Sequence, residues 1–464
     1  MELINLQRLS AINITSIIWE KPDIKRQIRE LFELKSNKEL QIRELLTQGI
    51  KIDPTSTQKQ DRYQNFQFIL QSVLQHLNSI KLPLNLQNYT QYIASELGEK
   101  IYDWNEYVND ILKFNLKFTE KIIWSPHGTI DENKIFKSWK NDCQLLNPRN
   151  TDSITPAIYV IACINAQEDF IRKNQDKMEK LLKDRVANFD LSNYHHKVYT
   201  LMSLTLSCHI NRNCRENIII NTADLIISPV KMLQICAAAC FPNAVYYYWK
   251  VLSDFGYKRE YCLINPLDWC LVQSSNYWCN YKKTKLGEIL TFLIGHMSSD
   301  QKIEFLQKNI VKVFCGILPA WPFNEQIMPL INEYLRNLTV EEYQDVAFCI
   351  LHSIKENEGG SKIKYFCSVF KNIFTDLPKD TKNQIFSHDF LKANYYQIFC
   401  VECLILIFNN INSNERIEAL KQIEKDIYKW ASERNIEKLN IFVDKVLISD
   451  EERNYFKINV TNIR

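Results

Sequence analysis

The sequence predicts an all-α protein built from stacked antiparallel helix pairs. Two observations carry this prediction. The 464 residues include 9 glycines, whereas the usual abundance of roughly 7% would supply more than about thirty. Apolar residues also recur at spacings of three and four along much of the chain, which is the pattern of amphipathic helices and not the alternation of half-buried strands.

The scarcity of glycine also bears on function. The few glycines are placed so that neither a G-x-G-x-x-G fingerprint nor a G-x-S-x-G elbow nor a Walker loop can be written. The chain carries 57 Lys and Arg against 54 Asp and Glu, a net charge of +3, so it has no global field to steer it onto a polyanion. Dinucleotide binding, P-loop chemistry and α/β-hydrolase chemistry are therefore not expected.

The expected helices follow from the apolar faces and from their start signals. Faces with helical spacing lie within residues 66–80, 303–317, 343–354, 363–373 and 417–427. Start signals combine a side-chain acceptor at the N-cap with either Pro at the first helical position or Glu/Gln three residues later. They occur at Thr155-Pro156, Ser228-Pro229, Ser298 with Gln301, and Thr339 with Glu342.

The helix starts recur with a period near 40. An apolar residue followed by a capping residue or Pro occurs at Met297-Ser298, Leu338-Thr339 and Leu377-Pro378, so that the three starts are almost evenly spaced. Helices of roughly 299–318 and 323–337 fill one unit, and a turn at Glu358–Ser361 divides the next. This arrangement is typical of an α-solenoid, in which helix pairs stack on their neighbours. An irregular helical bundle is the alternative.

A resemblance to a known family supports the repeat interpretation. Residues 228–256 resemble a degenerate ankyrin repeat, with Ser228-Pro229 for the Thr-Pro start, Ala237-Ala238 for the small helix-packing residues and Gly256 for the terminal glycine. The wider segment of about 150–410 is similar to divergent ankyrin-type helical-repeat proteins from expanded, arthropod-associated families, and it also has HEAT-like unit lengths. The resemblance implies a protein-binding scaffold without catalytic activity.

Polar breaks suggest three regions. They are a helical N-terminal region at 1–128, a helical-repeat region at 129–411 and a charged helical C-terminal cap at 412–464. A polar closing surface is what the end of a solenoid requires.

Cysteine usage and hydropathy point to a cytoplasmic protein. The 14 cysteines begin at Cys143, and none precedes it; such a distribution favours buried free thiols over a disulfide framework. The longest apolar run, Tyr395 to Phe408, contains Glu402 and is shorter than the ~20 residues that span a bilayer. We therefore expect a reducing compartment and no membrane segment.

Metal, cofactor and catalytic sites are not expected. Cys208-His209 with Cys214, and the cysteines at 262, 270 and 279, are spaced more widely than the close pairs of zinc sites. Cys400 and Cys403 have tight spacing but lie in a very apolar stretch and are interpreted as core. The 8 histidines show no local context that would activate a nucleophile. An enzyme with residues assembled from distant helices is kept as a third possibility.

Aromatic clusters supply the candidate binding residues. Tyr246, Tyr247, Tyr248 and Trp249 cannot all face one way on a helix, so part of this cluster is expected to be a protein-binding patch. Trp321, between two helices, is a further anchor candidate. The alternative function is binding of RNA or single-stranded nucleic acid through residues 276–285, where aromatic rings adjoin lysines. The residues concerned are Tyr277, Trp278, Tyr281, Lys282, Lys283 and Lys285.

Overall fold

Most of the described part of the protein is helical. The computed structural model describes residues 6–33, 54–106, 122–125, 128–132, 134–135, 138, 228–274, 280–356, 362–387, 390, 401–411, 415–421, 440, 443–447 and 449–461. Within these ranges the only β contact is an isolated antiparallel bridge between Trp124 and Ile130. No helix in the described part is long and apolar enough to cross a membrane. The all-α prediction is confirmed.

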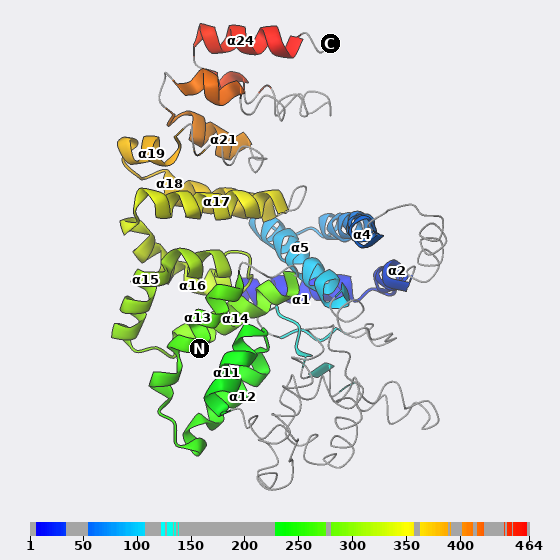
Figure 1. Cartoon of the computed structure of the whole chain (residues 1–464). Helices are drawn as coiled ribbons and strands as arrows, with labels where there is room; N and C mark the ends of the chain where they lie inside the picture. The colour runs from blue at the N-terminus through cyan, green and yellow to red at the C-terminus, as the bar shows by residue number, and fades with distance from the viewer. Residues whose placement is uncertain are drawn as a thin grey trace, which may run out of the picture. The chain divides into compact units, whose positions relative to one another are not determined.

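Figure 1 shows the helices coloured along the chain. They divide into two compact units. The first comprises Met1–Asp300 with Ala320–Phe323, and the second comprises Gln301–Pro319 with Asn324–Arg464. The division falls near residue 300, whereas the polar breaks in the sequence suggest boundaries at 128 and 411.

The first unit begins with α1 (Leu6–Trp19), α2 (Pro22–Glu33), α4 (Pro54–Ser79) and α5 (Leu84–Glu106). It continues with α11 (Pro229–Ala238), α12 (Pro242–Val251), the 3-10 turns η5 (Leu252–Phe255) and η6 (Arg259–Cys262), α13 (Ile264–Ser274) and α14 (Asn280–Gly295). α5 packs against α1, α4 and α14. It is the central helix of this unit.

α5 is buried on every side along its second half. All residues from Ile93 to Asn105 are buried, and they include the charged residues Glu96, Glu99, Lys100 and Asp103. Buried charges require partners, and two of these contacts are clear: the hydroxyl of Tyr63 donates to Glu99 at 2.8 Å, and Lys100 donates to Thr284 at 3.4 Å. A polar network therefore surrounds a helix in the interior.

A close approach of α1 and α5 depends on Gly98. A Cβ at this position would lie 2.4 Å from Cζ2 of Trp19. The Trp19 indole is 2% exposed and donates to the carbonyl of Ala94 at 3.0 Å. It also stacks on Phe66, with ring centroids 6.1 Å apart. Glycine is what lets the indole lie against the α5 backbone.

The second unit contains α15 (Ser299–Ile317), α16 (Phe323–Tyr334), η7 (Leu335–Asn337), α17 (Val340–Glu356), α18 (Lys362–Phe374), α19 (Lys379–Ile385), α21 (Val401–Phe408) and α24 (Asp450–Thr461). α17 packs against α18 and α19, and α18 packs against α21. These are paired helix contacts. They do not by themselves establish a regular solenoid.

Several helix starts confirm the sequence prediction. The hydroxyl of Ser228 accepts a hydrogen bond from the amide of Lys231 at the start of α11. Thr339 and Glu342 form a reciprocal capping box at the start of α17, at 2.9 and 3.2 Å. α15, α17 and α19 begin within two residues of Ser298, Thr339 and Pro378. Thr155-Pro156 and the turn at 358–361 lie outside the described residues.

A buried ion pair holds the C-terminal part of the second unit. Nε of Arg416 donates to Oε1 of Glu452 at 2.5 Å, and the two side chains are 3% and 4% exposed. The guanidinium also donates to the carbonyls of Phe408 and Val446. One arginine thus connects α21, the 443–447 segment and α24.

Candidate functional site

The aromatic stretch of α12 faces inward. Tyr248 is fully buried, and Tyr247 and Trp249 are 9% and 8% exposed. Tyr246 is half-buried, and its hydroxyl donates to Glu288 on α14 at 2.9 Å. Burial, followed by the charge of Glu288, raises the pKa of Tyr246 well above 10.0. In this structure the stretch joins α12 to the interior and does not offer the exposed rings that a partner-binding patch requires.

Lys285, a candidate of the nucleic-acid alternative, is also buried. Its Nζ lies 2.9 Å from Oε1 of Glu132 and 3.5 Å from Oε2 of Glu288, and its side chain is 9% exposed. Burial alone would lower the pKa of Lys285, but the two carboxylates outweigh it and raise the pKa above 10.5. An ammonium enclosed between two glutamates is not available to phosphate.

The other candidates from the sequence fall into two groups. Trp321 is 1% exposed, lies against Gly128, and has Arg8 and Lys100 at 5.5 and 5.4 Å from its ring centroid, so it is a core residue of the first unit. The second group consists of residues whose side chains are not described. Tyr277 and Trp278 lie outside the described residues, and Tyr281, Lys282 and Lys283 belong to α14 but their side chains lie outside the description.

Exposed aromatic residues appear instead just after α12. Tyr261 is 75% exposed, Ile264 is 46% exposed and Tyr257 is 37% exposed. Together with the exposed Lys258 they lie within residues 257–264, and we call this exposed segment the tyrosine turn. In the sequence Gly256 marks the end of one helical segment, but no local pattern marks the residues after it as exposed.

Local backbone geometry holds the tyrosine turn in place. Gly256 adopts φ +79, and a Cβ there would meet nothing within 4 Å, so the requirement for glycine is conformational. The amides of Gly256 and Tyr257 donate to the carbonyls of Ser253 and Leu252 at 3.1 Å, which closes the end of η5. The neighbouring residues Cys262 and Leu263 are buried and anchor the far side.

Two cations lie over rings at this surface. Nζ of Lys258 is 5.9 Å from the ring centroid of Tyr261. The guanidinium of Arg259 is 5.8 Å from the ring of Trp249 and donates to the backbone carbonyl of Lys250. Arg259 therefore ties the exposed turn to the buried aromatic stretch of α12. Lys258 shares the exposed side with Tyr261.

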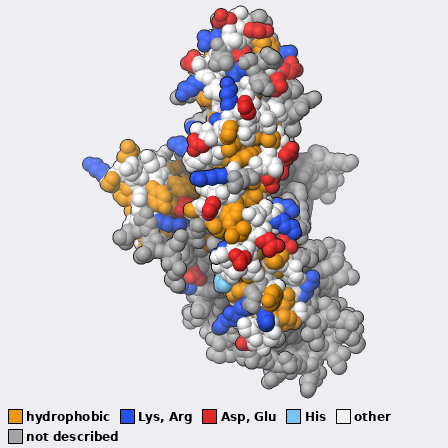
Figure 2. Space-filling model, turned by 90° about the vertical axis from the view of Figure 1, so that its left-hand side faces the viewer, with side chains coloured by type: hydrophobic (Ala, Val, Ile, Leu, Met, Phe, Trp, Pro, Cys, Tyr) orange, Lys and Arg blue, Asp and Glu red, His pale blue; other side chains and the backbone are white. Residues whose placement is uncertain are grey.

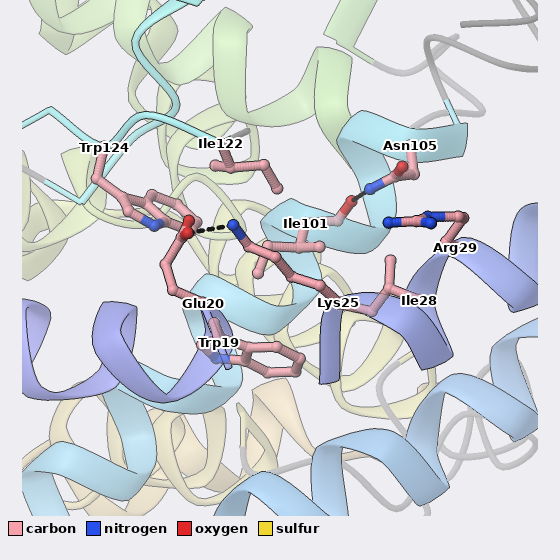
Figure 3. Close-up of a pocket in the computed structure, with 9 residues that line it drawn as sticks. All are labelled: Trp19, Glu20, Lys25, Ile28, Arg29, Ile101, Asn105, Ile122 and Trp124. Atoms are coloured by element: carbon pink, nitrogen blue, oxygen red, sulfur yellow. Dashed lines mark hydrogen bonds and ion pairs between the residues drawn. The ribbon is translucent and has the colours of Figure 1, made fainter. Parts of the chain in front are cut away.

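A small pocket opens between the first helices of the chain (Figure 3). Its walls come from the end of α1, from α2, from α5 and from the 122–125 segment, and it is lined by Trp19, Glu20, Lys25, Ile28, Arg29, Ile101, Asn105, Ile122 and Trp124. Lys25 and Glu20 form an ion pair across its mouth. The indole N–H of Trp124 is buried and has no hydrogen-bond partner among the described residues.

The pocket is too small for a metabolite. Its free volume is about 30 Å³, which is room for one or two water molecules, whereas ligand sites measure about 300–1,000 Å³. The buried N–H of Trp124 and the nearby Lys25–Glu20 ion pair are groups to which ordered water can hydrogen-bond. No group of three or more His, Cys, Asp or Glu side chains that could hold a metal ion is found in the described part of the chain.

Surface charge is mixed on the face drawn in Figure 2. Basic and acidic side chains alternate among hydrophobic ones over the coloured residues, without a continuous basic band. This matches the near balance of charge in the sequence. It does not resemble the basic stripe that marks a nucleic-acid groove.

Comparisons with protein-family models, with curated proteins and with solved structures find no match for this chain. The resemblance to ankyrin-type repeats therefore stays a prediction that rests on the residues quoted for it.

Proposed function

We propose that this chain is a non-enzymatic scaffold that binds a protein partner through the tyrosine turn of its first unit. The exposure of Tyr261, at 75%, carries the proposal. Exposed tyrosines on a fixed backbone are typical anchors of protein interfaces, since a large rigid ring buries much area at little entropic cost. Ile264 and Tyr257 are exposed in the same short segment.

The charges around the turn favour a protein over a nucleic acid. Asp254 and Asp268 are exposed close to the turn in the sequence, and carboxylates repel phosphate. The guanidinium of Arg259 already contacts Trp249 and the Lys250 carbonyl. A surface that binds single-stranded nucleic acid would need several uncommitted cations along the backbone path.

The proposal includes the scaffold expected from the sequence. We infer that the helix pairs stack in the manner of an ankyrin-like or HEAT-like solenoid, and the support is the almost even spacing of the helix starts near Ser298, Thr339 and Pro378. We also place the protein in the reducing cytoplasm, for which the buried free thiols of Cys236, Cys240, Cys262 and Cys270 are the support.

Site-specific photo-cross-linking tests the binding surface. A photoreactive phenylalanine derivative at position 261 should give a discrete protein adduct in native cells, because the ring it replaces would lie in the interface. The matched control carries the same group at Lys364, which is exposed on α18 in the other unit. The 261 adduct should also weaken when Ile264→Ser is introduced beside it.

Two results would contradict the proposal. One is an adduct pattern at 261 that does not differ from the pattern at 364, which would mean that the turn has no dedicated partner. The other is an adduct that nuclease treatment removes, which would mean that the exposed tyrosines stack on bases and that the nucleic-acid alternative is correct.

A further inference from the structure

Two buried thiols face each other in the second unit. Sγ of Cys403 on α21 lies 4.0 Å from Sγ of Cys367 on α18, in hydrogen-bonding contact. The two residues are 0% and 3% exposed, and both are free cysteines. They lie 36 positions apart in the sequence, so their contact depends on the packing of α18 against α21.

Aromatic packing holds α18 in position. Phe366 and Phe370 on α18 are buried, and Phe370 packs on Phe374 and Phe386 with ring centroids 4.7 and 5.9 Å apart. A disulfide requires an S–S distance of about 2.05 Å, so the sulfurs must approach by about 2 Å. Rotation about the Cα–Cβ bonds is the motion that brings the two sulfurs together.

We propose that Cys367 and Cys403 are an oxidation site that closes a disulfide between α18 and α21. The oxidant is a hydroperoxide, in the simplest case hydrogen peroxide. One thiol loses its proton, the thiolate attacks a peroxide oxygen, the O–O bond breaks and a sulfenic acid forms, and the departing hydroxide takes up the thiol's proton to leave as water. The second thiolate then attacks this sulfur, the S–O bond breaks, and the leaving hydroxide takes up the released proton. Two thiols and one hydrogen peroxide become one disulfide and two waters.

Burial sets the conditions under which the reaction proceeds. Neither sulfur is accessible in the closed structure, so the oxidant reaches the pair only when the contact between α18 and α21 opens. The pair therefore responds slowly to peroxide in the native protein and faster when mild denaturant promotes local opening. Once closed, the disulfide restricts the unfolded chain across the loop between residues 367 and 403 and stabilises the second unit.

Peptide mapping of the oxidised full-length chain tests the assignment. The reduced protein is incubated with hydrogen peroxide, its remaining thiols are blocked, and it is digested without reductant. The expected product joins the tryptic peptides 365–371 and 393–416 with loss of two hydrogen atoms. Dithiothreitol should separate them. The melting temperature should rise on oxidation and return on reduction.

The variants separate this pair from its neighbours. Cys367→Ala should abolish the linked product, whereas Cys400→Ala, in the same tryptic peptide as Cys403, should leave it intact. Cys349→Ala is a further control, since this thiol is half-buried on α17. Circular dichroism of each variant shows whether it folds. If a variant does not fold, the peptide map of the wild-type protein is sufficient to test the proposal.

Two outcomes would overturn the proposal. The first is the absence of any linked peptide in the wild-type chain, including under mild denaturant. The second is a disulfide that fragmentation assigns to Cys400, or that persists in Cys367→Ala.

Discussion

Gly98→Ala should destabilise the first unit, although alanine is the better helix former. The new Cβ would lie 2.4, 2.9 and 3.3 Å from three atoms of the Trp19 ring, far inside ordinary contact distance. The ring cannot move away cheaply, because its N–H donates to the Ala94 carbonyl and its face stacks on Phe66. The substitution thus sets a local helix preference against packing.

The magnitudes decide which effect is larger. Replacing a helical glycine by alanine favours the folded state by about 1 kcal/mol. Overpacking a close-packed site costs about 1–3 kcal/mol. If the indole turns to escape, its buried N–H loses its acceptor at a cost of about 1–3 kcal/mol. The two costs together are about 2–6 kcal/mol, so after the gain of about 1 kcal/mol the net change in the free energy of unfolding is a loss of about 1–5 kcal/mol.

Hydrogen–deuterium exchange on peptides from α1 and α5 measures this loss within the first unit. Each 1.4 kcal/mol raises the opening equilibrium constant by about tenfold, so protection should fall by about tenfold or more. Gly295→Ala is the matched control. Gly295 is an exposed residue at the end of α14, and a Cβ there meets nothing within 4 Å, so the same chemical change should be neutral or slightly stabilising.

A double mutant makes the reasoning refutable. In a Trp19→Leu background the space near Gly98 is open, and the penalty of Gly98→Ala should disappear or reverse, even though Trp19→Leu is itself destabilising. If Gly98→Ala stabilised the wild-type protein as a plain helix substitution does, or if its penalty persisted without the indole, the clash with Trp19 would not be the cause.

Further predictions concern the buried polar contacts. Arg416→Met alone should lower the free energy of unfolding by about 3–5 kcal/mol because it leaves Glu452 buried and unpaired, whereas the double variant with Glu452→Leu should recover most of this loss. Urea unfolding followed by circular dichroism measures both variants. An equal loss in the two would contradict the ion-pair explanation. The raised pKa of Tyr246 means that the stability linked to its proton is fully present below about pH 10 and is lost as the pH rises above it. Tyr246→Phe should therefore be less stable at pH 8, by about 1.5–3 kcal/mol for a hydrogen bond to the Glu288 carboxylate, yet lose less stability than the wild type between pH 9 and pH 11. An unchanged alkaline slope in that variant would exclude this tyrosine as the titrating group.

The sequence was a good guide to where helices begin and to which faces are apolar. Local chemistry explains this success, because a capping box such as Thr339 with Glu342 involves residues three positions apart. The inward faces were predictable for the same reason. Val346, Ala347 and Ile350 on α17 have helical spacing and are all fully buried.

The candidate site was less predictable, because inside and outside depend on distant partners. Lys285 appears in the sequence as one of several loop lysines, yet its nearest carboxylate belongs to Glu132, far earlier in the chain. Aromatic residues show the same limit. The ring of Trp249 packs on Phe292 and His296, and no local pattern distinguishes it from the exposed ring of Tyr261.

The enclosure of α5 has a consequence for how the protein can be divided. The segment of α5 from Ile93 to Asn105 is buried on all sides. α1 and α4 pack on this helix, and α14, which comes much later in the chain, packs on it too. Removal of residues 1–128 would take α5 away from the helices that follow it. Thr284 and Trp321, which contact Lys100, would then be exposed. The N-terminal helices and α11–α14 therefore belong to one compact unit. A deletion series should lose the whole unit at once instead of trimming it.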